Sequence, residues 1–254
     1  MDDCKIDWSM FDHVFCIHHL PFRDRMPRLE AELRRVDLLD SPNFSFEFTV
    51  PSFYDKVVFG ATKSAGLNDL LTVGQLNLVL ATYRILALSE AMGYGRILIM
   101  EDDVAFLKDK KEIVATLEML PERYDICLFD KFAYAGLPTE EYESYLRDTV
   151  NERYARYDRL KSCGCYSLNG SFIPLLKAAY ERRLMITDEY TSVFDFGRPV
   201  EKIFSIKNLC CQVSYAGCSN VHHGGRNCIH DAYARQRLDY GEYSVGDFGY
   251  GDLL

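Results

Sequence analysis

Short apolar runs alternate along the chain with longer stretches in which apolar side chains recur every third or fourth position. Residues 14–20, 97–100 and 126–129 are typical of buried strands, because large or β-branched side chains follow one another with little polar alternation. Residues 44–50 place Phe or Val at every second position, which predicts a strand with one buried face. Residues 165–168 are a further strand candidate.

Helical periodicity fills the intervals between these runs. Residues 27–36 carry apolar side chains at i, i+4 and i+7 and begin with a proline, which suits the first helical turn. Residues 72–92 form the longest periodic stretch, which opens with a capping-box spacing and is ended by glycines. Shorter helices are expected at 113–120 and 171–179.

Strands that alternate with helices predict an α/β fold, in which a Rossmann-like, mostly parallel sheet is flanked by helices in a single domain. Such sheets bind their ligands at the carboxyl ends of the strands. Arg23 and Arg25 follow the first strand, and Glu101 and Asp103 follow the strand at 97–100. These four side chains are therefore expected at one edge of the sheet.

Two segments differ in composition from the rest. Residues 131–160 are polar and charged with weak helical periodicity, which predicts a solvated helical insertion. Residues 240–254 repeat glycine, tyrosine and acidic residues without an apolar stripe, which predicts a mobile tail.

Composition narrows the class of protein. With 254 residues, of which 48% are hydrophobic, the chain can bury a substantial core. A net charge of -9 argues against a general affinity for nucleic acid. Nine scattered cysteines suit a reducing compartment. The sequence has no apolar run long enough for a transmembrane helix, and its first residues lack a signal-peptide pattern. We therefore expect a cytoplasmic protein, for which a peripheral membrane contact stays open.

Three consecutive carboxylates, Glu101, Asp102 and Asp103, end the run at 97–100. On an extended segment, Glu101 and Asp103 share a face and can bind one hard divalent cation, whereas Asp102 points the other way. Oxygen ligands favour Mg²⁺ or Mn²⁺. The alternative is an acidic loop exposed to water, because carboxylates this close repel one another and are costly to bury without a cation.

The order of four motifs resembles glycosyltransferase family 25, which holds bacterial lipooligosaccharide galactosyltransferases and collagen galactosyltransferases. The matching segments are 14–20 with Arg23 and Arg25, 71–75 and its helix, 97–104, and 164–169 followed by Leu175, Leu176 and Asp188. The family has Glu where Gln75 stands and a Ser-His pair where Ala81 and Thr82 stand, so the roles of those residues are not carried over.

The resemblance implies a GT-A fold over residues 1–239, with a donor-binding half at about 10–130 and an acceptor half at about 160–239. It implies transfer of a hexose, in the first place galactose, from a UDP-sugar to a glycan or to a lipid-linked acceptor of lipooligosaccharide type. In this interpretation Mn²⁺ or Mg²⁺ is held by Glu101 and Asp103. The donor-binding residues are then His18, Arg23, Arg25 and Asp102.

Direct displacement at the sugar with inversion requires a base that takes the proton of the acceptor hydroxyl. Asp188 is the first candidate, and Asp130 and Asp195 are the alternatives. An ordinary helix N-cap explains Asp188 equally simply. His222, in a glycine-flanked loop, is a candidate third metal ligand.

A structural zinc site is a rival interpretation of the same C-terminal region. Its possible ligands are Cys210, Cys211, Cys218, His222, His223, Cys228 and His230. No pair of them has the spacing of a zinc knuckle, and ordinary buried thiols explain the cysteines as well.

Two other functional classes stay open. A metal-dependent nucleotidyltransferase would use the same carboxylates, but the first strand is followed by arginines and not by a phosphate-binding glycine loop. A non-catalytic protein that binds a sugar nucleotide or a protein partner is the other class, and Gln75, Ala81 and Thr82 motivate it.

Overall fold

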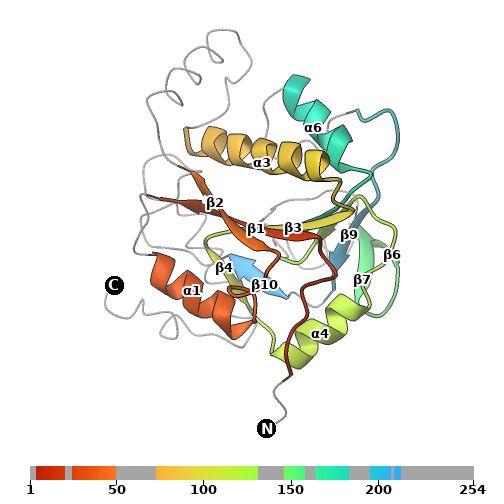
Figure 1. Ribbon diagram of the computed structural model, residues 1–254. Coiled ribbons are helices and arrows are strands. Elements are labelled where there is room, and N and C mark those ends of the chain that lie inside the picture. Colours follow the sequence, from red (N-terminus) through yellow and green to blue (C-terminus); the bar gives the residue numbers. More distant parts are fainter. Residues whose placement is uncertain are drawn as a thin grey trace, which may run out of the picture.

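The computed structural model describes residues 4–20, 25–49, 73–130, 146–157, 164–182, 195–206 and 209–212 (Figure 1). The helices are α1 (Met26–Arg35), α3 (Val73–Met92), α4 (Lys110–Glu118) and α6 (Ile173–Arg182). The main sheet contains β1 (His13–His19), β2 (Phe44–Thr49), β3 (Arg96–Glu101), β5 (Ile126–Leu128), β6 (Leu146–Thr149), β7 (Tyr154–Tyr157), β8 (Cys165–Asn169) and β9 (Lys202–Ser205). A second, two-stranded sheet pairs β4 (Val104–Phe106) with β10 (Cys210–Gln212).

The main sheet has the strand order β2-β1-β3-β8-β5-β9-β7-β6. Strand β1 is parallel to β2 and β3, and β5 is parallel to β9, whereas β8 lies antiparallel between β3 and β5. Strand β7 is also antiparallel to both of its neighbours. Strands β7 and β8 therefore run against the direction that the other strands share. The carboxyl ends of β1, β3 and β5 meet at one edge, and the amino end of β8 lies among them.

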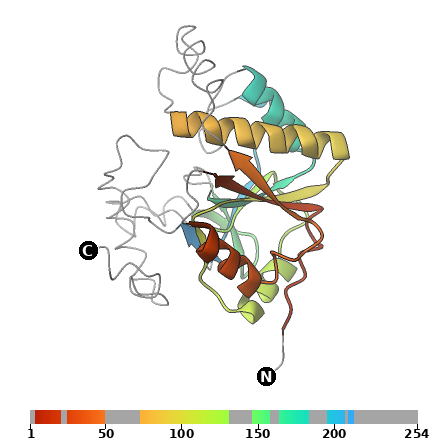
Figure 2. The same cartoon turned by 60° about the vertical axis from the view of Figure 1, so that its left-hand side comes forward.

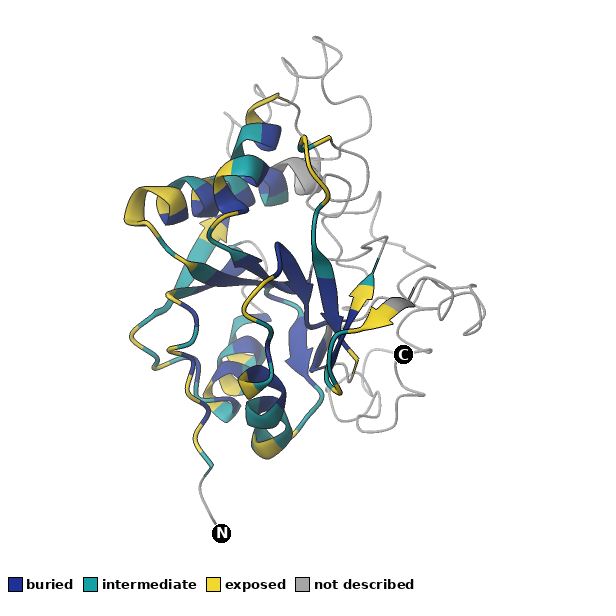
Figure 3. Ribbon diagram, turned by 90° about the vertical axis from the view of Figure 1, so that its right-hand side faces the viewer, coloured by how far each residue is buried: buried dark blue, intermediate teal, exposed yellow. Residues whose placement is uncertain are grey.

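Alternation along the strands divides the core into two clusters on opposite faces of the sheet. Helices α3 and α6 lie on one side of the sheet, and α1 and α4 lie on the other (Figure 2). In β3, Ile97 and Ile99 pack in the cluster that α3 and α6 cover. Leu98 and Met100 pack in the cluster that α1 and α4 cover. The central strands are consequently buried on both faces, while the outer surfaces of the helices are exposed (Figure 3).

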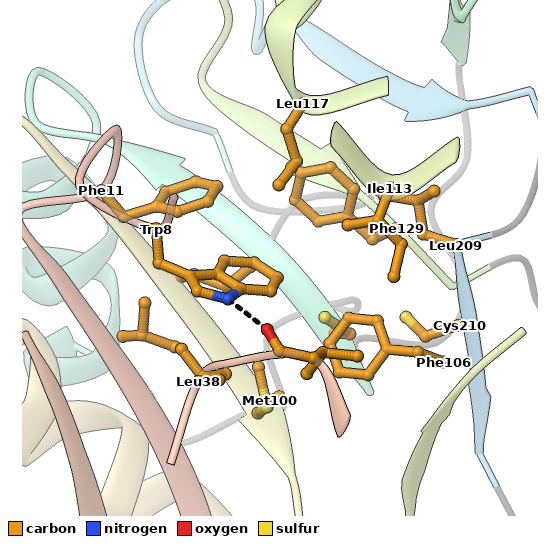
Figure 4. Packing of buried hydrophobic residues seen from close by; sticks show 14 of the residues in the cluster. Trp8, Phe11, Leu38, Met100, Phe106, Ile113, Leu117, Phe129, Leu209 and Cys210 are labelled. Atoms are coloured by element: carbon orange, nitrogen blue, oxygen red, sulfur yellow. Dashed lines mark hydrogen bonds between the residues drawn. The ribbon is translucent and has the colours of Figure 1, made fainter. Parts of the chain in front are cut away.

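Trp8 anchors the segment before β1 in the second of these clusters (Figure 4). Its Nε1–H donates to the backbone oxygen of Val36, just beyond α1, at 2.8 Å. The indole ring also meets the ring of Phe106 edge-on, with the centroids 5.9 Å apart. Trp8 thereby joins the N-terminal segment, the end of α1 and strand β4, which directly follows the three carboxylates.

The observed architecture confirms the expected α/β class: one mostly parallel sheet, flanked by helices on both faces, in a single domain. The strands and helices expected outside residues 131–160 are present to within a few residues. In the part of the chain that the structure describes, no helix is both long enough and apolar enough to span a membrane.

The expected helical character of residues 131–160 is wrong for the part that is described. Residues 146–157 form β6 and β7, which extend the main sheet beyond β9. Tyr154 shows the reason, because its side chain is fully buried and its hydroxyl donates to the backbone oxygen of Thr116. Tertiary burial overrides a weak local helical pattern. The rest of that insertion, and the predicted tail at 240–254, lie outside the described residues.

Candidate functional site

The three carboxylates lie where β3 leaves the main sheet, and residues 101–103 are called the acid turn below. Glu101 is the last residue of β3, and its N–H donates to the backbone oxygen of Gly164 at 2.8 Å. Asp102 and Asp103 form a turn, after which β4 begins at Val104. The alternation that predicts side-chain directions therefore holds up to Glu101, and beyond it the turn sets the directions.

Asp102 is buried and connects three parts of the fold, with 5% of its surface exposed. One of its carboxylate oxygens accepts from the guanidinium of Arg25, at the start of α1, at 2.6 Å. The other accepts from His18 Nδ1 at 2.8 Å and from the backbone N–H of His19 at 3.2 Å, both at the end of β1. Asp102 thus lies on the α1 side of the sheet.

These partners decide the charge of Asp102. Burial by itself would raise the pKa of the carboxyl group, because it disfavours the charged form. The hydrogen bond from His18 and the charge and hydrogen bond of Arg25 outweigh that effect and lower the pKa below its ordinary value. Asp102 is therefore a carboxylate, and His18 Nδ1 carries the hydrogen that it donates to Asp102.

Glu101 is in the opposite situation. Burial raises its pKa well above the ordinary value, and the charges of Asp103, Asp102 and Asp130 raise it further, in that order. The charge of Arg25 opposes this shift only weakly. Glu101 therefore lies in a crowded group of carboxylates, where a nearby positive charge would stabilise its ionised form.

Asp130 belongs to this carboxylate group from the far side of β8. It follows β5 and is almost completely buried. Its side chain accepts from the backbone N–H of Cys165, the first residue of β8, at 3.2 Å. The reversed strand β8 consequently separates Asp130 from Glu101, while both residues lie at the same edge of the sheet.

The chemistry of these side chains fits a hard divalent cation, because each one offers carboxylate oxygens. Among the described residues, however, no three His, Cys, Asp or Glu side chains are arranged as a ready metal-binding group. Glu101 and Asp103 can supply two ligands, and water or substrate phosphate oxygens can complete the coordination of such a cation.

The other predicted site residues divide into three groups. His18 and Arg25 lie at the expected edge, but both contact Asp102. Asp195, an alternative base, is exposed and accepts from the backbone N–H of Gly197. Arg23, Asp188 and His222 lie outside the described residues.

Among the proposed zinc ligands, Cys210 is the one whose side chain the structure describes. This residue is buried in the hydrophobic cluster between the sheet, α1 and α4. The structure describes only the backbone of Cys211, and the other proposed ligands lie outside the described residues.

Sequence reasoning left two features of the site unassigned. The first is the contact between His18 and Asp102, which lie 84 positions apart. The second is the place of Asp130 beside Glu101, for which the only sequence signal was a carboxylate directly after a buried strand. That signal is the same one that identified the acid turn.

No protein-family model and no curated protein matches this chain. Similar solved structures include mannose-1-phosphate geranyltransferase from Thermus thermophilus, with 14% identity and a TM-score of 0.41 over 76% of this chain and 73% of that chain. The galactosyltransferase LgtC, solved with donor and acceptor sugar analogs, has 11% identity and a TM-score of 0.40 over 93% and 99%. Mouse xyloside xylosyltransferase 1 has 12% identity and a TM-score of 0.29 over 77% and 97%. With identities and TM-scores this low, the likenesses assign neither a family nor a function, and membership of glycosyltransferase family 25 stays a prediction.

Proposed function

We propose that this protein is a metal-dependent glycosyltransferase of GT-A type, which moves a hexose from a UDP-sugar to a glycan or lipooligosaccharide-type acceptor. Galactose is the proposed hexose. The observation that carries the proposal is the environment of Glu101, a half-buried residue at the carboxyl edge of a mostly parallel sheet whose carboxyl group feels the charges of Asp103, Asp102 and Asp130. Such a crowded carboxylate group is costly for an enzyme that has no cation to bind there.

Glu101 and Asp103 are the proposed ligands of Mn²⁺ or Mg²⁺. When bound, the cation supplies positive charge for the diphosphate that departs from the sugar. His222 is the proposed third ligand. Strand β10 supports this role, because Gln212 pairs with Val104, the residue after Asp103. His222 lies ten positions after Gln212, and because a segment of that length can extend to about 33–36 Å, the chain is long enough for His222 to be a ligand there.

The protein must also supply a base for the acceptor hydroxyl. Asp188 keeps that proposed role, together with direct displacement and inversion. Asp130 is the described alternative, because it lies among the same carboxylates as Glu101. It is almost completely buried, so an acceptor hydroxyl would reach it only after a local rearrangement.

Calorimetry with Mn²⁺ and UDP tests the proposal directly. Wild-type protein is expected to bind UDP in the presence of Mn²⁺ and to lose this affinity in EDTA. Asp103→Ala should abolish both metal-dependent UDP binding and turnover, whereas Asp40→Ala, which removes an exposed carboxylate, should leave both unchanged. Equal UDP affinity in wild type and Asp103→Ala would reject the metal assignment.

Product analysis separates the remaining classes. A glycosyltransferase releases UDP from the sugar donor, and slow hydrolysis of the donor without acceptor also marks it as a transferase. Release of pyrophosphate from a nucleoside triphosphate and a sugar phosphate would identify a nucleotidyltransferase instead. Tight UDP-sugar binding without turnover on a broad acceptor panel would identify a binding protein.

A further inference from the structure

His18, Asp102 and Arg25 form a buried cluster that joins three separate elements, and it is called the latch below. His18 is the penultimate residue of β1, Asp102 lies in the acid turn and Arg25 precedes α1. The contacts measure 2.8 Å from His18 Nδ1 and 2.6 Å from the guanidinium of Arg25, each to a different oxygen of Asp102.

Burial argues against direct contact between the latch and a substrate. The exposed fractions are 1% for His18 and 7% for Arg25. The ring of Phe48, at the same register position on β2, lies against the His18 ring edge-on at 6.0 Å. A donor could reach either side chain only after the latch had opened, which would leave the Asp102 carboxylate buried with fewer partners.

The latch instead fixes the turn to which Asp103 belongs. Asp102 is held from one side by β1 and from the other by α1, and Asp103 is the next residue. On the far side of Asp103, strand β4 is bound to α1 as well, because the N–H of Phe106 donates to Glu32 at 2.6 Å. Asp103 is therefore held between two attachments, of which the latch is the nearer.

We propose that His18 and Arg25 are positioning residues, which act through Asp102 to hold Asp103 in place for ligand binding. The inference rests on the proposed function for the identity of the ligand. It removes His18, Arg25 and Asp102 from the set of donor contacts and makes Asp103 the member of the acid turn whose placement they determine.

A double-mutant cycle distinguishes positioning from donor contact. Arg25→Met and Asp102→Asn should each weaken Mn²⁺-dependent UDP binding about 10- to 100-fold, the range seen when residues that orient metal ligands are changed. Because Arg25 acts through Asp102, adding Arg25→Met to Asp102→Asn should change the affinity by less than about twofold. A full additional loss in the double variant would show that Arg25 supports binding by a route other than Asp102 and would overturn the proposal.

His18 allows a rescue experiment. The side-chain amide of Asn can donate from nearly the position of His18 Nδ1, so His18→Asn should retain most of the binding, whereas His18→Ala should lose it. Equal loss in both variants would require the imidazole ring itself and would overturn the positioning role. Turnover measured on the same variants should follow binding, since a positioning residue takes part in no proton transfer.

Asp12 supplies a matched control at the amino end of β3, the strand whose carboxyl end is the acid turn. Its carboxylate accepts from the backbone N–H groups of Gly95 and Arg96, at 2.6 and 2.9 Å, where β3 begins. Asp12→Asn should therefore loosen the amino end of β3 without affecting UDP binding. An equal loss of binding in this variant would mean that any damage to β3 suffices and would overturn the specific role of the latch.

Amide exchange measured by mass spectrometry tests the latch without any ligand. Asp102→Asn should speed exchange about tenfold or more at Phe106 and Leu107, and Asp12→Asn should do so at Gly95 and Arg96. If exchange changes as expected but wild type binds no UDP with Mn²⁺, the proposed function is wrong. The latch would then fix the acid turn without a role in UDP binding. Unchanged exchange at Phe106 and Leu107 in both Asp102→Asn and the double variant would overturn the latch, whatever the enzyme assays give.

Discussion

Neighbouring carboxylates of the acid turn should affect stability in opposite directions when no metal is present. Asp102→Ala would leave the guanidinium of Arg25 and the ring of His18 buried beside an empty position. Removing one partner of a buried ion pair costs about 3–5 kcal/mol, because the other charge stays buried without compensation. At about 2–4 °C per kcal/mol for a chain of this size, the melting temperature should fall by about 6–20 °C.

Glu101→Gln should instead stabilise the protein near neutral pH. The folded state raises the pKa of Glu101 above its ordinary value of 4.5, so folding favours the protonated form. The stability that this group contributes is present below pH 4.5 and is lost as the pH rises through the folded-state pKa. Glutamine carries no charge at any pH, so its advantage over wild type should grow from pH 4.5 towards neutrality.

Urea unfolding followed by circular dichroism, with EDTA present to remove metal ions, measures both effects. Titrations at several pH values should give a smaller free energy of unfolding for Asp102→Ala throughout and a larger one for Glu101→Gln near neutral pH. The reasoning would be refuted if Glu101→Gln were less stable than wild type at neutral pH, or if Asp102→Ala unfolded at the wild-type urea concentration.

Two further predictions concern the opposite edge of the sheet. Gly170→Ala should lower the free energy of unfolding by about 1–3 kcal/mol, because a Cβ there would lie 2.6 Å from the backbone oxygen of Tyr94. Gly95→Ala is the control, since its Cβ would meet only a side-chain oxygen at 3.4 Å. Equal melting temperatures for the two variants in calorimetry would contradict this prediction. His13, whose pKa burial lowers below 6.5 and whose Nε2 contacts Ser45 at 2.8 Å, should contribute stability that is present above pH 6.5 and is lost as the pH falls through the folded-state pKa. Urea unfolding should show this loss in wild type and not in His13→Gln.

The sequence predicted the central strands well because their own residues determine them. The apolar side chains of β3 suit a strand between two helical layers and few other environments, so residues 97–100 were placed correctly. Residues 146–157 were not, because β6 and β7 are strands only through their pairing with each other and with β9. The antiparallel direction of β8 was equally hidden, since the course of the chain before it sets that direction and the composition of residues 165–169 does not.

The site was predicted in part for the same physical reasons. The carboxylates directly after a buried strand located Glu101 at the carboxyl edge of the sheet, whereas Asp130, which follows another buried strand, was not placed beside it. The partners of Asp102 could not be deduced, because the contacts to His18 and Arg25 join residues 84 and 77 positions apart. An arginine or a histidine beside a predicted site can bind substrate or can pair with a carboxylate inside the protein. Only the burial seen in the structure distinguishes these two roles.

The pairing of Val104 with Gln212 also has a consequence for how the protein is made. A ribosome must have synthesised at least 212 residues before β10 can join β4, so the short sheet beside the acid turn forms late, however early the central strands assemble. Fragments that stop short of β10 are therefore expected to form the main sheet but to lack the short sheet beside the acid turn.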